Sequence, residues 1–176
     1  MRNPRMEGDM VAKSRFPSSY SVHYSFSQRF GFPARDAYNW SMDYRSDDIE
    51  RMGERGTRRI RRINDDTLVL TDTFFSDKGG RVSKRRLIRM YPELLTMVNT
   101  RLSADGIHSQ FIYRFVDEGE GRSRLDFTGA QVFYGEKPTA PKLASLAREM
   151  AKEDSAVWVR LAAAMKNDLG ARSKGS

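Results

Sequence analysis

The sequence contains no cysteine. This absence excludes disulfide bonds, thiolate nucleophiles and zinc sites built on cysteine. Its two histidines, His23 and His108, lie at metal-ligand spacing from neither another histidine nor a carboxylate, so we expect no metal site. The G-x-S-x-G nucleophile elbow and the glycine loops of nucleotide-binding sites are also missing. We therefore expect no cofactor.

Long apolar runs are missing as well. No run approaches the ~20 residues that a membrane span requires, and the first residues, MRNPRMEGDMVAKSR, lack the apolar centre of a signal peptide. We therefore expect a cytoplasmic protein. A chain of 176 residues is long enough for one domain with a sizeable core. We predict that this domain spans residues 18–170, between flexible tails at 1–17 and 171–176.

Positive charge dominates, with 31 Lys and Arg against 23 Asp and Glu, a net charge of +8. Such a balance favours an anionic partner. Basic runs at residues 58–62 and 84–86 could form one positive stripe on the outer face of a sheet. Aromatic residues are not interleaved with them, and Asp65, Asp66 and Asp72 lie close by, so nucleic-acid binding is disfavoured. Transient contact with an anionic membrane is the alternative.

The residues from Thr139 to Leu169 predict one long helix. Thr139 can cap its start, Pro141 is tolerated in the first turn, and Gly170 marks its expected end. At about 1.5 Å per residue this helix is about 45 Å long and needs a broad apolar surface to pack against. Asp154 interrupts a stripe of apolar residues that recur at spacings of three, four and seven. The apolar residues of this stripe are Leu143, Leu146, Ala147, Met150, Val157, Trp158, Leu161, Ala162, Met165 and Leu169.

Strand patterns supply that surface. Apolar and polar residues alternate from Ser19 to Ser27, which predicts a half-buried strand. Helical spacing follows around residues 32–44 and 47–52. Six further strand candidates are joined by short turns, which favours an antiparallel meander in the order β-αα-ββββββ-α. These candidates are Thr57–Ile63, Leu68–Phe75, Arg81–Tyr91, Leu94–Leu102, Ile107–Val116 and Arg122–Phe133.

This order and several motifs resemble the START-like or helix-grip superfamily, also called SRPBCC, which includes polyketide cyclase/dehydrase-like, lipid-transfer and birch-pollen-allergen-like proteins. The matching stretches are PARDAYNWSMDYRSDD, MGERGTRRI, KRRLIRMYPE, SQFIYRFVDEGEGRSRLDFTG and EDSAVWVRLAAAMKNDL. The resemblance covers roughly residues 19–169. It implies an α+β fold in which the long helix packs across a curved, seven-stranded antiparallel sheet. It also implies a hydrophobic cavity between the two.

Asp154 and Arg86 are the polar residues of greatest interest for such a cavity. Asp154 either pairs with a sheet arginine or water, or faces the cavity with a raised pKa. Arg86 points inward only if the register of residues 81–91 places Leu87 outside. The aromatic candidates either fill the core or line the cavity. The predicted ligand-binding residues are Tyr24, Phe26, Trp40, Arg86, Phe111, Tyr113, Phe127, Asp154, Trp158 and Leu161.

Three functions are compatible with the sequence. The leading hypothesis is a non-catalytic protein that binds a hydrophobic small molecule or lipid. The second is a cyclase- or dehydratase-like enzyme, in which Asp154 is the general acid/base and Arg86 polarises a carbonyl. The third is an interaction protein with a solid core and a basic sheet face. An internal void of several hundred Å³ distinguishes the first two from the third.

Overall fold

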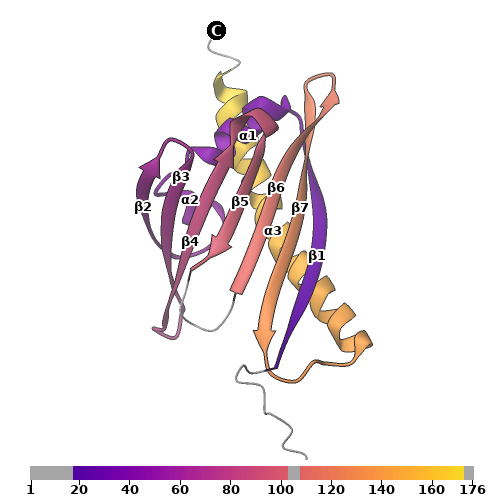
Figure 1. The fold of residues 1–176 in the computed structure, drawn as a ribbon. Coiled ribbons are helices and arrows are strands. Elements are labelled where there is room, and N and C mark those ends of the chain that lie inside the picture. The colour runs from indigo at the N-terminus through magenta and orange to yellow at the C-terminus, as the bar shows by residue number, and fades with distance from the viewer. Residues whose placement is uncertain (1–17, 103–107, 173–176) are drawn as a thin grey trace, which may run out of the picture.

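The computed structural model describes residues 18–102 and 108–172. Seven strands form one antiparallel sheet in the order β1-β7-β6-β5-β4-β3-β2, and α3 crosses one face of it (Figure 1). The predicted curved sheet, the two short helices after the first strand and the long C-terminal helix are confirmed. The elements are β1 (Ser19–Phe30), α1 (Ala34–Met42), α2 (Asp48–Arg51), β2 (Gly56–Asn64), β3 (Thr67–Phe75), β4 (Arg81–Tyr91), a 3-10 turn (Pro92–Leu94), β5 (Thr96–Arg101), β6 (His108–Gly119), β7 (Arg122–Tyr134) and α3 (Ala140–Arg172).

Several boundaries differ from the sequence prediction by one to three residues, and two of the differences have a local cause. The helix α3 continues through Gly170 to Arg172, because an interior glycine costs only about 1 kcal/mol relative to alanine and no proline follows it. The fifth strand begins at Thr96 rather than Leu94, because the 3-10 turn and the left-handed φ of 46° at Leu95 interrupt the extended backbone. Of the tail expected at residues 171–176, the first two residues belong to α3; residues 173–176, the expected tail at 1–17 and Ile107 lie outside the described residues.

The helix α3 covers the sheet unevenly. Its most extensive contact with the sheet is along β1, at one edge. There the ring of Trp158 packs against Phe30 and Phe115, with ring centroids 6.4 and 6.2 Å away. At the opposite edge of the sheet, β2, β3 and β4 extend away from α3 (Figure 1). The inner face of these three strands is therefore the part of the sheet where space can remain.

One carboxylate joins the C-terminal part of α3 to the two short helices. Oδ2 of Asp168 accepts hydrogen bonds from Trp40 Nε1 at 2.9 Å, Arg45 Nη1 at 2.8 Å and Arg51 Nη1 at 2.7 Å. Burial acts to raise the pKa of Asp168, but the hydrogen bonds from Trp40 and Arg51 and the charge of Arg51 outweigh it and hold the pKa below its usual value. These bonds fix where the segment from α1 to α2 sits against α3.

Replacing Asp168 with Asn should lower the free energy of unfolding by about 1–3 kcal/mol at pH 7, because a neutral amide cannot balance two arginines. The control is Glu153→Gln, which removes a negative charge from the exposed side of the same helix and should change stability by less than about 0.5 kcal/mol. Urea unfolding measures both.

The folded pKa of Asp168 is lowered, so its contribution to the free energy of unfolding is full above pH 3.8 and is lost as the pH falls through the folded pKa. Equal stability of the two variants at pH 7 would contradict a stabilising role for the hydrogen bonds to Asp168.

Candidate functional site

A cavity of about 440 Å³ lies between the inner face of β2–β4, the segment from α1 to α2, and the middle of α3. This volume is within the range of small-molecule pockets. Apolar side chains come from all three sides; the lining cations are on the sheet, and the lining carboxylates are on α2, α3 and the segment between α2 and β2. The lining residues are Trp40, Ser41, Met42, Tyr44, Asp48, Met52, Glu54, Arg58, Leu70, Phe74, Val82, Lys84, Arg86, Ile88, Met97, Asn99, Tyr113, Asp154, Val157, Trp158 and Leu161.

The strand register decides which charges face this cavity. Arg58 lies opposite Asp72, and Asp72 lies opposite Lys84, in one row across β2, β3 and β4. Asp72 is fully buried, so this row faces inward. Because side chains alternate along a strand, Arg86 faces inward as well, and Arg85 faces the outer side. The register of β4 is therefore the one in which Arg86 rather than Leu87 points toward the cavity.

Asp72 is the centre of a buried ion cluster. Arg58 donates to its two carboxylate oxygens from Nε at 2.8 Å and Nη2 at 3.0 Å, and Arg86 donates from Nη2. The remaining terminal nitrogen of Arg58, Nη1, donates to Asp48 at 2.6 Å. Burial acts to lower the pKa of Arg58, but the hydrogen bond and charge of Asp72 outweigh it and raise the pKa. The cluster thus ties three strands to α2.

Other polar atoms at the cavity have no such partners. Nε of Arg86 and Oδ1 of Asn99 are buried, and neither has a hydrogen-bond partner among the described residues. Tyr113 lies beside them in the lining. Burial and the charge of Asp154 raise the pKa of Tyr113, so its hydroxyl stays protonated at neutral pH. The sheet side of the cavity therefore offers two neutral polar side chains and an incompletely used guanidinium.

Asp154 is held on the helix side by a tyrosine. Tyr24 donates its hydroxyl proton to Asp154 Oδ2 at 2.6 Å. Gly129 makes room for this tyrosine, because a Cβ there would lie 2.8 Å from two Tyr24 ring carbons. Burial raises the pKa of Asp154 and outweighs the hydrogen bond from Tyr24 and the charge of Lys84. Of the two alternatives for Asp154, the structure shows the second: the side chain faces the cavity with a raised pKa, and its hydrogen-bond partner is Tyr24 rather than a sheet arginine.

The ten predicted ligand-binding residues fall into two groups. Trp40, Arg86, Tyr113, Asp154, Trp158 and Leu161 line the cavity. The other four form an aromatic cluster under β1, β7 and β6, where the rings of Tyr24, Phe26 and Phe111 lie 5.5, 4.5 and 5.8 Å from that of Phe127. This group fills the core because α3 packs over β1. Of the four, Tyr24 reaches the cavity indirectly, through Asp154.

Several residues of the cavity were not predicted from the sequence. Asp72 could have been found, because it shares strand parity with the buried Leu68 and Leu70. Tyr44 has no such signal. It adopts a left-handed φ of 41°, a conformation that costs on the order of 1–3 kcal/mol, and its hydroxyl lies 2.6 Å from Met97 Sδ. Strain of this kind depends on tertiary packing and leaves no pattern in the sequence.

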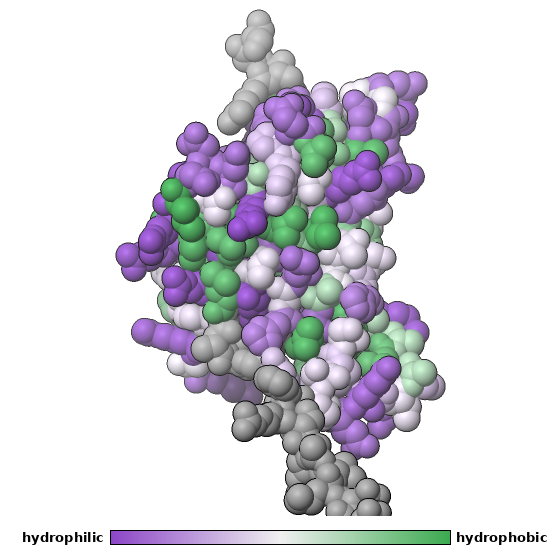
Figure 2. Space-filling model, viewed as in Figure 1, coloured by the Kyte–Doolittle hydropathy of each residue, from purple (hydrophilic) through white to green (hydrophobic). Residues whose placement is uncertain are grey.

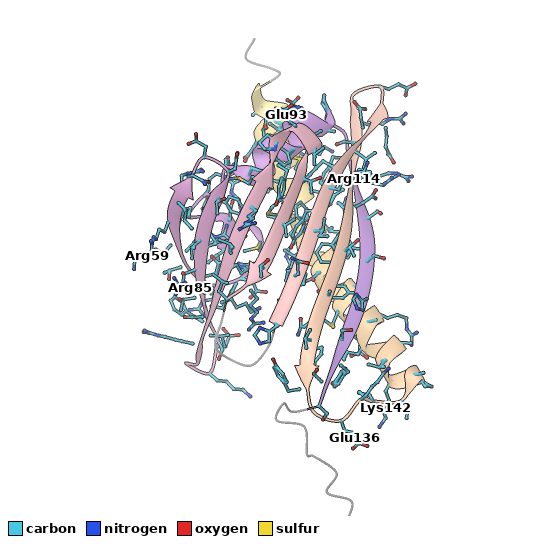
Figure 3. The ribbon with its side chains drawn as sticks, in the orientation of Figure 1. Arg59, Arg85, Glu93, Arg114, Glu136 and Lys142 are labelled. Atoms are coloured by element: carbon cyan, nitrogen blue, oxygen red, sulfur yellow. The ribbon has the colours of Figure 1, made fainter. Side chains whose placement is uncertain are left out.

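The predicted positive stripe on the outer face is smaller than expected. Arg59 and Arg85 lie on the outer face of β2 and β4, and Arg114 lies on that of β6 (Figure 3). Arg58, Lys84 and Arg86 belong to the inner face, because alternation divides each basic run between the two sides. Apolar patches interrupt the polar outer surface (Figure 2); Ile112, for example, is 40% exposed. The outer face is therefore a mixed surface.

In residues 18–102 and 108–172, no helix has the length and apolar character needed to cross a membrane. The same residues contain no group of three or more histidine, aspartate or glutamate side chains arranged to hold a metal ion.

Known structures share this fold. No protein-family model and no curated protein sequence matches the chain. The Zhui aromatase/cyclase from Streptomyces sp. R1128 has a TM-score of 0.68 and 12% sequence identity, over 85% of this chain and 96% of that one. A START superfamily protein from Mycobacterium smegmatis has a TM-score of 0.58 and 16% identity, over 83% and 98%. Truncated norcoclaurine synthase from Thalictrum flavum has a TM-score of 0.62 and 10% identity, over 82% and 93%. The chain has the START-like helix-grip fold, and identities this low establish the fold alone.

Replacing Asp72 with Ala should lower the free energy of unfolding by about 3–5 kcal/mol, because it leaves two inward-facing arginines without their shared carboxylate. The matched control is Asp77→Ala at the β3–β4 turn, where the ion pair with Arg55 is exposed on both sides and contributes at most about 1 kcal/mol. Chemical unfolding followed by circular dichroism measures both. Similar losses in the two variants contradict a structural role for the cluster.

Replacing Asp154 with Asn should flatten the dependence of stability on pH. In the wild-type protein the folded pKa of Asp154 is raised above 3.8, so the folded state holds its proton longer than the unfolded state. Stability should therefore fall as the pH rises from 3.8 through the folded pKa, and the asparagine variant should lack this loss. Urea unfolding from pH 3.5 to 8 measures the slope, with Glu149→Gln on the exposed side of α3 as control. An unchanged slope in the asparagine variant contradicts the raised pKa.

Proposed function

We propose that this protein binds a hydrophobic small molecule or lipid in the cavity between β2–β4 and α3. The observation that carries this proposal is the cavity of about 440 Å³, bounded by apolar side chains such as Leu70, Ile88 and Trp158. Protein interiors are close-packed, and a void much larger than a water molecule forfeits dispersion contacts. A ligand of matching shape restores those contacts.

Two further observations support this function in kind. The fold is shared with an aromatase/cyclase and a norcoclaurine synthase, both named for chemistry on small molecules. The alternative of a basic interaction surface over a solid core has less support, because a pocket of about 440 Å³ lies between sheet and helix and the basic runs divide between the two faces of the sheet. The outer arginines are instead compatible with brief contact with an anionic membrane during lipid exchange.

Catalysis in the same cavity is the second candidate, and Asp154 favours it. A carboxyl group whose pKa is raised by burial holds its proton to a higher pH than an exposed carboxyl and can transfer it to a bound substrate. Arg86 on the sheet side could polarise a carbonyl of that substrate. Mass-spectrometric detection of a product that has lost water distinguishes such an enzyme from a carrier.

Filling the cavity tests the binding function. Val157 lines the cavity, whereas Val159 on the same helix is 57% exposed. Val157→Phe should weaken binding of the neutral probe N-phenyl-1-naphthylamine about tenfold or more, a change of about 1.4 kcal/mol, because the added ring occupies ligand space. Val159→Phe adds the same volume toward solvent and should leave binding unchanged. Fluorescence titration gives both affinities.

The outcome that contradicts the proposal is equally clear. A wild-type protein that does not bind the neutral probe, or two phenylalanine variants that bind it equally well, would argue against a ligand cavity at this position. Circular dichroism spectra of both variants establish that they are folded before the titrations are compared.

A further inference from the structure

The two inward-facing arginines differ in how fully their hydrogen-bonding groups are used. Arg58 directs Nε, Nη1 and Nη2 to carboxylate oxygens of Asp48 and Asp72. Arg86 directs Nη2 to Asp72, whereas its Nε is buried without a hydrogen-bond partner among the described residues. A buried donor without a partner is costly, more so when it belongs to a charged group. Arg86 is therefore the arginine at which a ligand oxygen gains most.

A second cation, Lys84, lies near Arg86. Lys84 faces the same side of β4, at the edge of the cavity, with its amine 5.0 Å from the Phe74 ring centroid. Partial shielding of this amine, together with the charges of Arg86 and Arg101, lowers the pKa of Lys84. A depressed lysine pKa is the response expected where cations repel one another. An anionic group bound here relieves that repulsion.

The carboxylate on the helix side, Asp154, interacts with the charges of Lys84 and Arg86 and is hydrogen-bonded by a tyrosine. The Asp154 carboxylate is held by Tyr24 of β1, and β1 is separated from β4 by β7, β6 and β5 in the sheet. Between the two polar positions the lining is largely apolar, with Ile88 on the sheet and Trp158 and Leu161 on α3. The cavity thus has two neighbouring cations on β4, Lys84 and Arg86, beside a largely apolar body.

We propose, building on the binding function above, that the ligand is an amphiphile with an apolar body and one carboxylate, and that the carboxylate docks on Arg86. A carboxylate matches the planar edge of a guanidinium with two parallel hydrogen bonds. It accepts from Nε of Arg86, and the neutral hydroxyl of Tyr113 in the same lining is a further donor. Lys84 adds a second positive charge at the edge of the cavity.

The first experiment compares ligands that differ only in the head group. Dodecanoate and methyl dodecanoate are each used to displace N-phenyl-1-naphthylamine from the wild-type protein. Dodecanoate should bind about tenfold to a hundredfold more tightly than the ester, the range that a charge-assisted hydrogen bond provides. Equal affinities overturn the carboxylate proposal while leaving the binding function intact.

The second experiment tests the position of the head group. Arg86→Gln should reduce the preference for the acid over the ester to less than about threefold, with little change in affinity for the ester. Arg89→Gln is the matched control, because Arg89 is on the same strand and exposed on the outer face; it should keep the full preference. Lys84→Gln, which leaves the Asp72 cluster intact, should reduce the preference by a smaller factor and is informative even if Arg86→Gln does not fold.

The remaining outcomes are distinct. A folded Arg86→Gln protein that retains the full preference for the acid overturns docking on Arg86. If Arg86→Gln is unfolded by circular dichroism, an unchanged preference in Lys84→Gln overturns it instead. If the acid, the ester and the neutral probe all fail to bind the wild-type protein, the binding function itself fails, and the carboxylate proposal fails with it.

Discussion

The architecture of the site depends on one buried carboxylate. Asp72 sits at the centre of the inner face of β3 with no exposed surface, and a charge in that position is tolerated only when it is paired and hydrogen-bonded. Arg58 from β2 and Arg86 from β4 provide that pairing. The inner face of β2–β4 consequently carries charge where β1, β6 and β7 carry aromatic rings. A helix cannot close over such a surface with apolar packing alone, which explains why the cavity lies on this side.

The position of α3 follows from two carboxylates on the helix itself. Asp154 is bound by Tyr24 at the β1 edge, and Asp168 is bound by Trp40, Arg45 and Arg51 of the segment from α1 to α2. Between these two anchors the helix presents Val157, Trp158 and Leu161 to the cavity. Because both anchors are polar and directional, they fix where α3 sits relative to β1 and to the segment from α1 to α2.

The fold could be predicted from the sequence because it is encoded in local periodicity. The alternation in β1 and the helical stripe from Thr139 onward each arise from one element and its own two faces. The site could be predicted only in part. Whether Phe127 fills the core or lines a cavity depends on which strand α3 covers, and no local pattern states this. The sequence left open which side chains of β4 face inward, because its residues are mostly polar. The structure decides this by placing Lys84 directly opposite the buried Asp72 on the neighbouring strand.

The polar residues of the cavity make opposite demands under the two candidate functions. In an enzyme, Arg86 must meet the reacting carbonyl, and Asp154 must reach a proton on the same part of the substrate. In a binding protein, Arg86 meets the head group, and Asp154 need not touch the ligand at all. Tyr24 already occupies one oxygen of Asp154, while the carboxyl still interacts with the charge of Arg86. The apolar lining between them then accommodates the body of a ligand whose head lies on β4. The two functions therefore differ in whether Asp154 must contact the ligand.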